Sequence, residues 1–246
     1  MKERVFWIDN IRAIAIISMV IYHAVWDLIY LYGMNWNWYR GEAAFLWQQS
    51  ICWTFILLSG FCWSFSKNPL KQGLLVSGAG LLVMVVTLVA SYESRIVFGV
   101  LTFIGASALI LVPLRKWFEK IPAWAGAILM FLLFAIFYGI NDGGIGIFKL
   151  QLLEVPEVFY RNLFTTFLGF TEKNFFSTDY FSLLPWAFLY FVGYFLYRLW
   201  KEGKIPNARC LNRKIPLLTS LGKKSLMIYL LHQPLLYGVF MVLFGR

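Results

Sequence analysis

A histidine and an aspartate, His23 and Asp27, lie four residues apart in a long apolar stretch near the N-terminus of the chain. Residues at this spacing face the same side of an α-helix, so the two side chains can meet. A carboxylate beside an imidazole fixes the tautomer of the ring and stabilises its charged form. The pair therefore predicts a general base toward a hydroxyl or an amine, or a histidine that itself accepts an acyl group.

A second pair, Asp9 and Arg12, lies at the start of the same stretch. The two can form an ion pair, or Arg12 can meet an anionic ligand that enters from that side. The four ionisable groups and Tyr30 fall within about 60° of helical arc, and the stripe from Asp9 to Asp27 is roughly 27 Å long. A charge at the bilayer centre costs roughly 2.5–3.5 kcal/mol, so the stripe indicates a protein interior or a water-filled path. A buried polar network that only holds helices together is the structural alternative.

The helix that carries this stripe belongs to a chain that is 60% hydrophobic and only 14% charged. Several apolar runs reach about 18 residues, the length that spans a bilayer. We therefore expect an all-α, polytopic membrane helix bundle, with residues 1–246 as a single domain, and not a soluble globule. The three cysteines, Cys52, Cys62 and Cys210, form no CxxC motif, so we expect free thiols and no metal site.

The apolar runs predict about seven spanning helices. They cover residues 6–32, 43–66, 73–91, 96–114, 123–140, 181–200 and 217–244. Small residues at the end of the second helix and along the third favour close helix packing. The segment 141–180 is too polar to span easily and is expected to form one or two interfacial helices. Pro234, in the middle of the last helix, predicts a kink there.

Lysine and arginine residues are distributed unevenly between alternate loops. Loops of one parity, with the adjoining helix ends, hold 15 of them and the other loops hold 6. Positively charged loops mark the cytoplasmic side, so the N-terminus is expected there, with the C-terminus and the segment 141–180 outside. This distribution accounts for the net charge of +10 without a nucleic-acid partner.

Depth in the membrane then relates the first and last helices. His23 and His232 lie about 25 and 22 Å from the cytoplasmic starts of their helices, which places both in the outer half of the membrane. Asp27 is expected near the outer surface, where Asp179 and Trp186 flank the same end of the sixth helix. We therefore predict a site with His23 and Asp27 as catalytic residues. The residues expected to line it are His232, Gln233, Asp179 and Trp186.

The order Asp9, Arg12, His23 and Asp27 resembles the catalytic-domain-like family of heparan-alpha-glucosaminide N-acetyltransferases, in particular its small bacterial members. This family consists of membrane acyltransferases. The resemblance continues in SGFCWSFS (59–66), FGVLTFIG (98–105), DYFSLLPW (179–186) and LGKKSLMIYLLHQP (221–234). These pieces follow one another in order along nearly the whole chain, so the resemblance does not depend on one motif.

The resemblance implies that an acyl group, typically acetyl from acetyl-CoA, passes from the cytoplasmic face to an acceptor on the other side, without a metal. His23 would be the active-site residue, while Arg12, with Asp9, would help to hold the acyl-CoA donor. The chain has Ala13 where the family usually has glycine. It has Thr102, another residue expected to line the site, where many members have histidine. A bacterial cell-wall or surface sugar is the acceptor expected for so short a chain.

The expected partners are membrane lipids, acyl-CoA and an extracytoplasmic, sugar-like acceptor, with no nucleic acid. The expected location is a bacterial cell membrane, with the chain as an integral multi-pass protein. A small-molecule transporter or proton-coupled permease is the main alternative, because ionisable stripes also form proton relays. A non-catalytic membrane assembly factor is a third hypothesis. Direct transfer and an acyl-histidine both stay open, as do a monomer and a homodimer.

Overall fold

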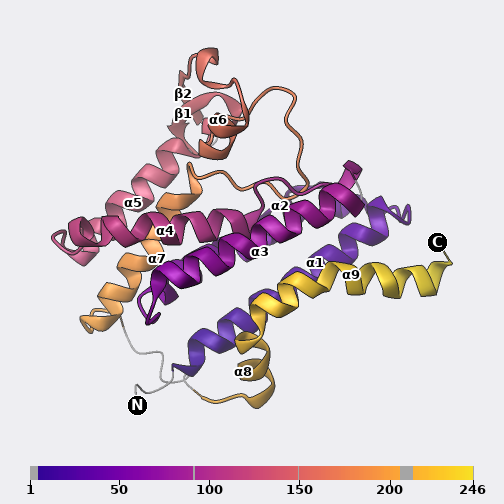
Figure 1. Ribbon diagram of the computed structural model, residues 1–246, viewed down its shortest axis with the longest axis horizontal. Helices are drawn as coiled ribbons and strands as arrows, with labels where there is room; N and C mark the ends of the chain where they lie inside the picture. Colours follow the sequence, from indigo (N-terminus) through magenta and orange to yellow (C-terminus); the bar gives the residue numbers. More distant parts are fainter. Residues whose placement is uncertain (1–4, 91, 149, 206–212, 246) are drawn as a thin grey trace. The chain divides into compact units, whose positions relative to one another are not determined.

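The computed structural model describes residues 5–90, 92–148, 150–205 and 213–245. This part of the chain consists mainly of helices, with one two-stranded sheet (Figure 1). Six of its helical segments are long and apolar enough to cross a membrane. They are α1 (Phe6–Tyr30), α2 (Glu42–Trp63), α3 (Pro69–Ala90), α4 (Val100–Phe118), the segment Ala123–Asp142 that begins with α5 (Ala123–Phe137), and α9 (Ser225–Phe244). The predicted polytopic helix bundle is therefore confirmed.

The last two predicted helices have different boundaries in the structure. The helix expected at 181–200 is α7 (Trp186–Lys201), which has 16 residues and starts after Pro185, the residue at its N-cap. Proline fits the start of a helix because its missing N–H has no helical partner there. The helix expected at 217–244 is divided at Lys224 into α8 (Pro216–Lys223) and α9, and Pro234 lies inside α9.

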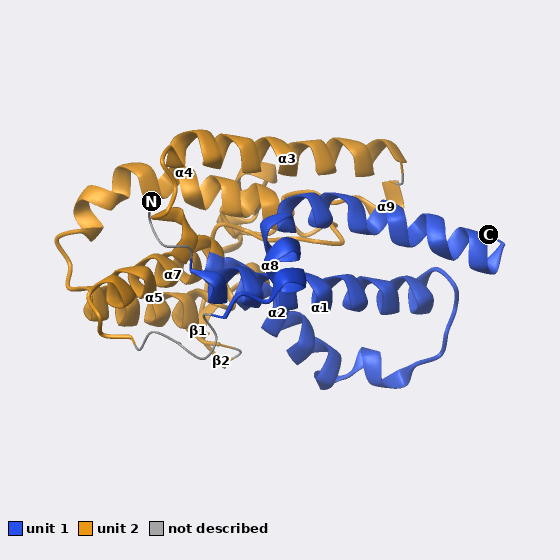
Figure 2. Ribbon diagram, turned by 90° about the horizontal axis from the view of Figure 1, so that it is seen from below, with its two compact units in different colours: residues 1–58, 206–246 blue, residues 59–205 orange. Residues whose placement is uncertain are grey.

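The chain divides into two compact units, drawn in different colours in Figure 2. The first unit comprises residues 1–58 and 206–246, and the second comprises residues 59–205. α2 begins in the first unit and ends in the second. The organisation of residues 1–246 as a single domain stays a prediction.

In the first unit, α1 packs against α8 and α9. Gly222 of α8 lies so close to α1 that a Cβ atom there would clash with the carbonyl oxygen of Asp9. Asn10 fixes the same crossing, because its Nδ2 donates to the carbonyl oxygen of Arg213 at 3.0 Å and its Oδ1 accepts from the Thr219 hydroxyl at 3.3 Å. The start of α1 is thus held on α8 by close packing and by side-chain hydrogen bonds.

The middle of α1 is covered by apolar side chains of α2 and α9. A buried cluster joins Ile16 and Met19 of α1 to Ile51 of α2, and Tyr229 of α9 packs against it. Beside this cluster, the indole N–H of Trp47 donates to the Ser18 hydroxyl of α1 at 2.8 Å. These contacts determine which face of α1 turns toward α9.

In the second unit, α3 packs along α4, and α5 packs along α7. The predicted small-residue packing is confirmed in two places. A Cβ atom at Gly80 of α3 would lie 2.5 Å from the backbone nitrogen of Thr102, and one at Gly60 of α2 would clash with the carbonyl oxygen of Tyr190. Small residues let helix backbones approach closely, which is how membrane helices gain packing contacts.

The segment 141–180 contains a β-hairpin that the sequence analysis did not predict. β1 (Gly144–Ile147) pairs antiparallel with β2 (Leu150–Glu154), and α6 (Leu163–Leu168) follows. All residues of β2 are exposed, and the adjacent Leu152 and Leu153 interrupt the alternation of apolar and polar residues that would indicate a strand. Single-turn helices complete the described elements: η1 (Asn37–Arg40), η2 (Tyr92–Ser94), η3 (Ile140–Asp142) and η4 (Glu157–Phe159).

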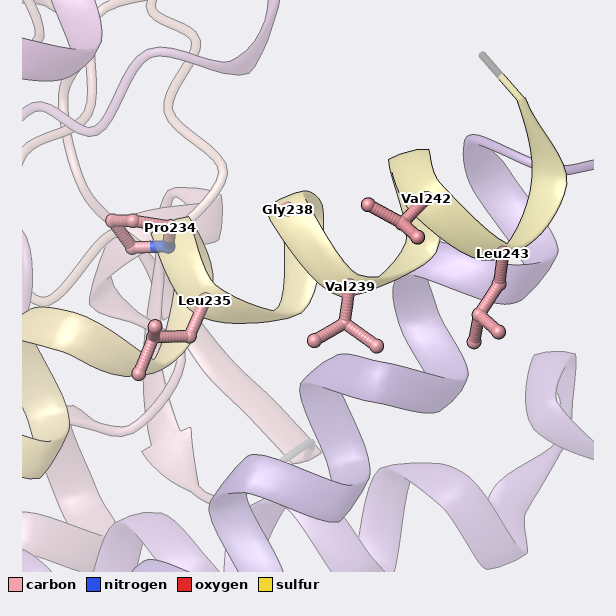
Figure 3. A pocket seen from close by; sticks show the side chains of 6 residues that line it. All are labelled: Pro234, Leu235, Gly238, Val239, Val242 and Leu243. Atoms are coloured by element: carbon pink, nitrogen blue, oxygen red, sulfur yellow. The ribbon is translucent and has the colours of Figure 1, made fainter.

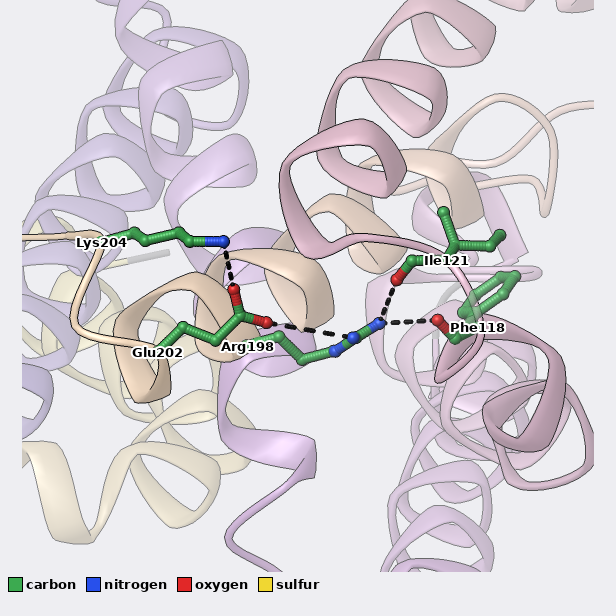
Figure 4. A network of polar contacts seen from close by, with 5 residues as sticks. All are labelled: Phe118, Ile121, Arg198, Glu202 and Lys204. Atoms are coloured by element: carbon green, nitrogen blue, oxygen red, sulfur yellow. Dashed lines mark hydrogen bonds and ion pairs between the residues drawn. The ribbon is translucent and has the colours of Figure 1, made fainter.

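Arg198, near the end of α7, caps the end of α4 (Figure 4). Its Nη1 donates to the carbonyl oxygens of Phe118 at 2.6 Å and Ile121 at 2.8 Å. Glu202 pairs with Arg198 at 4.0 Å and with Lys204 at 2.8 Å. The hydrogen bond from Lys204 holds the pKa of Glu202 below its usual range. Because the last carbonyls of a helix lack partners within it, Arg198 supplies donors that α4 cannot.

Candidate active site

Two histidines from helices at opposite ends of the sequence lie side by side in the first unit. The ring centroids of His23 on α1 and His232 on α9 are 4.9 Å apart, with an angle of 55° between the planes. His232 is buried and His23 is half-buried. The predicted similar depth of the two rings is confirmed by this contact.

The ring of His232 has a second fixed neighbour. Its Nδ1 lies 2.6 Å from the carbonyl oxygen of Tyr229, one helical turn earlier in α9. The sequence analysis did not single out Tyr229, although a residue three positions before a helical histidine faces the same side of the helix. This contact orients the ring that meets His23.

Asp27 is fully buried on α1, and its carboxyl group binds Gln233 of α9. Gln233 Nε2 donates to Asp27 Oδ1 at 2.7 Å. Asp27 Oδ2 and Gln233 Oε1 are both buried and have no hydrogen-bond partner among the described residues. A buried acceptor without a donor costs about 1–3 kcal/mol, so two together indicate a place where a ligand or water supplies donors.

The sequence predicted that His23 and Asp27 could contact each other, but in the structure their side chains have other partners. Within the described residues, the side-chain hydrogen bond of Asp27 goes to Gln233, and the ring contacts of His23 go to His232 and Tyr22. Helix periodicity places His23 and Asp27 on one face but does not show what the neighbouring helix offers. Here α9 provides a better donor for the carboxyl group than the adjacent imidazole.

At the other end of the stripe, Arg12 and Asp9 form the predicted ion pair. Arg12 Nη1 lies 3.7 Å from Asp9 Oδ1, and the side chains are 24% and 8% exposed, respectively. The rise of an α-helix places Arg12 about 16 Å from His23 along α1. The stripe therefore has a cationic group near one end and the histidine pair further along.

The other three predicted site residues belong to the second unit. The Thr102 hydroxyl is buried and has no hydrogen-bond partner among the described residues. Asp179 Oδ2 accepts from the backbone N–H of Val100 at 3.3 Å, where it caps α4. Trp186 packs against Phe134, with the ring centroids 5.5 Å apart. Asp179 and Trp186 thus have structural contacts within this unit, and their place beside an acceptor stays a prediction.

A hollow of about 410 Å³ lies along α9 after His232 (Figure 3). It is lined by the apolar residues Pro234, Leu235, Gly238, Val239, Val242 and Leu243. These side chains offer no group for acid–base chemistry, so the hollow is not a candidate for the reacting site.

The part of the chain that the structure describes contains no set of metal ligands. No group of three or more His, Cys, Asp or Glu side chains there is arranged to hold a metal ion. Cys52 and Cys62 are half-buried, whereas Cys210 lies outside the described residues. The side chains at the α1–α9 contact offer imidazole, carboxyl and amide groups.

The sequence matches the family described as heparan-alpha-glucosaminide N-acetyltransferase, catalytic, over residues 4–234. No curated protein and no solved structure matches the chain. The match covers nearly the whole chain and includes Arg12, His23 and His232. It implies a transmembrane acetyltransferase-like role, consistent with the six apolar helical segments. The chain therefore belongs to the heparan-alpha-glucosaminide N-acetyltransferase catalytic-domain family, as the order of its motifs predicted.

Proposed function

We propose that this protein moves an acetyl group from cytoplasmic acyl-CoA to a hydroxyl or amine of an extracytoplasmic sugar, in a bacterial cell membrane. The observation that carries the proposal is the contact of His23 with His232 at 4.9 Å. It lies on helices that also carry the buried Asp27–Gln233 pair. Ionisable groups in such helices are expensive to keep unless they serve a reaction or a path.

The donor side of the proposal rests on Arg12. A guanidinium presents several N–H groups in a plane, which suits the phosphate oxygens of acyl-CoA. Asp9 lies 3.7 Å from the Arg12 guanidinium and helps to orient it. The packing of α8 on this part of α1 fixes the backbone from which both side chains extend.

In this proposal, the acyl group reacts beside His23. Acyl-CoA supplies a thioester, whose carbonyl carbon is open to attack by a nucleophile. An imidazole can attack it directly, forming an acyl-histidine, or can assist transfer to the acceptor. Asp27 Oδ2 and Gln233 Oε1 are acceptors that suit an O–H or N–H of the incoming sugar. Both the direct and the covalent route are compatible with this arrangement.

The proposal is tested with purified protein in lipid nanodiscs, labelled acetyl-CoA and a panel of sugars and amino sugars. We expect acetylated sugar from the wild type and a rate about 10²–10⁴-fold lower from His23→Ala. Ile21→Ala, an exposed position on the same helix, is the matched control and should retain the wild-type rate.

Equal rates for the wild type and His23→Ala would show that His23 is not a catalytic residue. A wild type that acetylates nothing, but carries a labelled solute across liposomes without acyl-CoA, would replace the proposal with the transporter hypothesis.

A further inference from the structure

The hydrogen bond between His232 and the backbone determines which ring nitrogen carries a proton. Nδ1 lies 2.6 Å from the carbonyl oxygen of Tyr229, and a carbonyl oxygen only accepts. Nδ1 therefore carries the hydrogen and donates. In the neutral ring, Nε2 then holds the lone pair, which is the form of histidine that accepts a proton.

The surroundings of Tyr229 keep this arrangement in place. Tyr229 packs against the buried cluster of Ile16, Met19 and Ile51, so its backbone is held against α1. The ring of His232 contacts both the Tyr229 ring, at 5.5 Å between centroids, and the His23 ring at 4.9 Å. A base with a fixed tautomer thus lies directly beside the proposed acyl-transfer residue.

Asp27 is less suited than His232 to take the proton of the acceptor. One of its oxygens already accepts from Gln233 at 2.7 Å. His23, in turn, is the group expected to meet the acyl carbon, so it cannot also serve as the base in the covalent route. Nε2 of neutral His232 can accept the proton of the acceptor. The position of His232 next to His23 places this nitrogen beside the bond that forms.

We propose that His232 is the general base that activates the acceptor, an inference that rests on the proposed acyl transfer. As the acceptor oxygen or nitrogen bonds to the acyl carbon, its O–H or N–H bond breaks and the proton moves to Nε2. The bond from the acyl carbon to its leaving atom breaks, and that atom keeps the electron pair. In direct transfer the leaving atom is the CoA sulfur, and the proton on His232 then passes to it. In the covalent route CoA has already left as the thiolate when His23 was acylated, and the His23 nitrogen leaves as neutral imidazole. The proton on His232 then passes to solvent, where it balances the charge of the released thiolate.

The decisive variant is His232→Asn, assayed in nanodiscs with acetyl-CoA and the sugar that the wild type acetylates. The amide nitrogen of asparagine occupies the place of Nδ1 and can still donate to Tyr229, but the side chain has no basic nitrogen. We expect the transfer rate to fall about 10²–10⁴-fold while thermal stability changes little. Leu231→Ala, at an exposed neighbouring position on α9, is the control and should keep the wild-type rate.

A second measurement separates a base from a side chain that fills space. His232→Ala is assayed with added imidazoles of increasing basicity. We expect the rescued rate to rise with basicity, because efficiency in general base catalysis follows the strength of the base. Rescue that is independent of basicity would overturn the assignment. This measurement also applies if His232→Asn does not fold.

The two proposals fail in different ways. A wild-type protein without acetyl transfer would refute the proposed function and this assignment together. A wild type that is active, with His232→Asn folded and equally fast, would overturn the role of His232 alone and leave the acyltransferase in place.

Discussion

Two groups of buried polar side chains have opposite hydrogen-bond patterns. The α1–α9 cluster comprises His23, Asp27, His232 and Gln233, and it contains buried acceptors without a partner among the described residues. The Asn141 cluster, in the second unit, comprises Asn141, Thr166, Thr171, Tyr180 and Ser182, which bond one another and the nearby backbone.

The bonds of the Asn141 cluster tie together segments that are far apart in the sequence. Asn141 Nδ2 donates to the carbonyl oxygen of Gly169 and to the Ser182 hydroxyl, both at 2.9 Å. The Tyr180 hydroxyl donates to the carbonyl oxygen of Thr166 at 2.5 Å. Satisfied networks of this kind make a fold more specific and more rigid.

The comparison shows that buried polarity alone does not identify a site. Both clusters are polar, yet Asn141 has partners for its amide group whereas Asp27 retains an oxygen without one. The energetic cost of an unsatisfied acceptor is tolerated where a substrate supplies the missing donor. This difference supports the proposal that the α1–α9 cluster takes part in binding and chemistry, whereas the Asn141 cluster supports the fold.

Among the variants that test this comparison, the largest expected effect comes from Asp27→Asn. The substitution keeps an acceptor for Gln233 Nε2 and adds a donor that can reach Gln233 Oε1, while it removes the charge. We expect the acetyl-transfer rate to fall about 100-fold, with thermal stability equal to or above that of the wild type. Transfer assays and thermal unfolding of the same preparation measure both quantities.

Ile14→Ala, exposed on the same helix, serves as the control for Asp27→Asn. If Asp27→Asn unfolds more readily and transfers acetyl at the wild-type rate per folded molecule, the α1–α9 cluster is structural like its counterpart, and the comparison fails.

Asn141→Ala should lower stability and leave the transfer rate unchanged, the opposite of Asp27→Asn. It removes two hydrogen bonds of 2.9 Å and leaves the Ser182 hydroxyl and the Gly169 carbonyl without this donor. We expect a loss of about 2–3 kcal/mol in the free energy of unfolding, with the transfer rate per folded molecule retained. Denaturant titration measures the loss, and Asp142→Ala, at an exposed neighbour, should change little.

Arg198→Lys tests whether the end of α4 depends on the forked shape of arginine. Arg198 binds both carbonyl oxygens through Nη1 while Nη2 faces Glu202, and lysine keeps the charge but has only one nitrogen for all three partners. We expect a loss of about 1–2 kcal/mol in the free energy of unfolding. Arg161→Lys, at an exposed position, provides the matched change and should leave stability unaltered. Equal stability of all three proteins would show that the end of α4 does not depend on the two nitrogens of the arginine fork.

The smallest effect concerns alkaline pH. Burial raises the pKa of Tyr180, although its hydrogen bonds with Thr171, Ser182 and Asn141 lower it in part. The folded state thus favours the neutral phenol. This contribution to stability is complete below the pKa of an exposed tyrosine, about 10, and is lost as the pH rises through the folded-state pKa.

We therefore expect Tyr180→Phe to be less stable than the wild type by about 1 kcal/mol near pH 8, because it lacks the bond to Thr166. This difference in the free energy of unfolding should become smaller above about pH 10, because unfolding then allows Tyr180 of the wild type to lose its proton. Unfolding curves of both proteins across this pH range measure the difference in stability. A difference that increases with pH would mean that burial does not keep the Tyr180 phenol neutral.

Several features of the site and of the fold were predictable because they follow from local sequence. Asp9 and Arg12 lie three residues apart on one helix and form their ion pair. The small residues at Gly60 and Gly80 allow the close helix packing that their positions predicted. In contrast, the hairpin in 141–180 was missed because Leu152 and Leu153 interrupt the alternating pattern of the exposed strand β2.

The sequence by itself determined the membrane-helix class and the single face of α1 on which the ionisable groups lie. Both follow from composition and from the fixed turn and rise of an α-helix. Only the tertiary structure decided that Asp27 binds Gln233 and that His23 meets His232. Each of these pairs joins residues more than 200 positions apart. Their contact depends on how the side chains of α9 pack onto α1, which no local periodicity specifies.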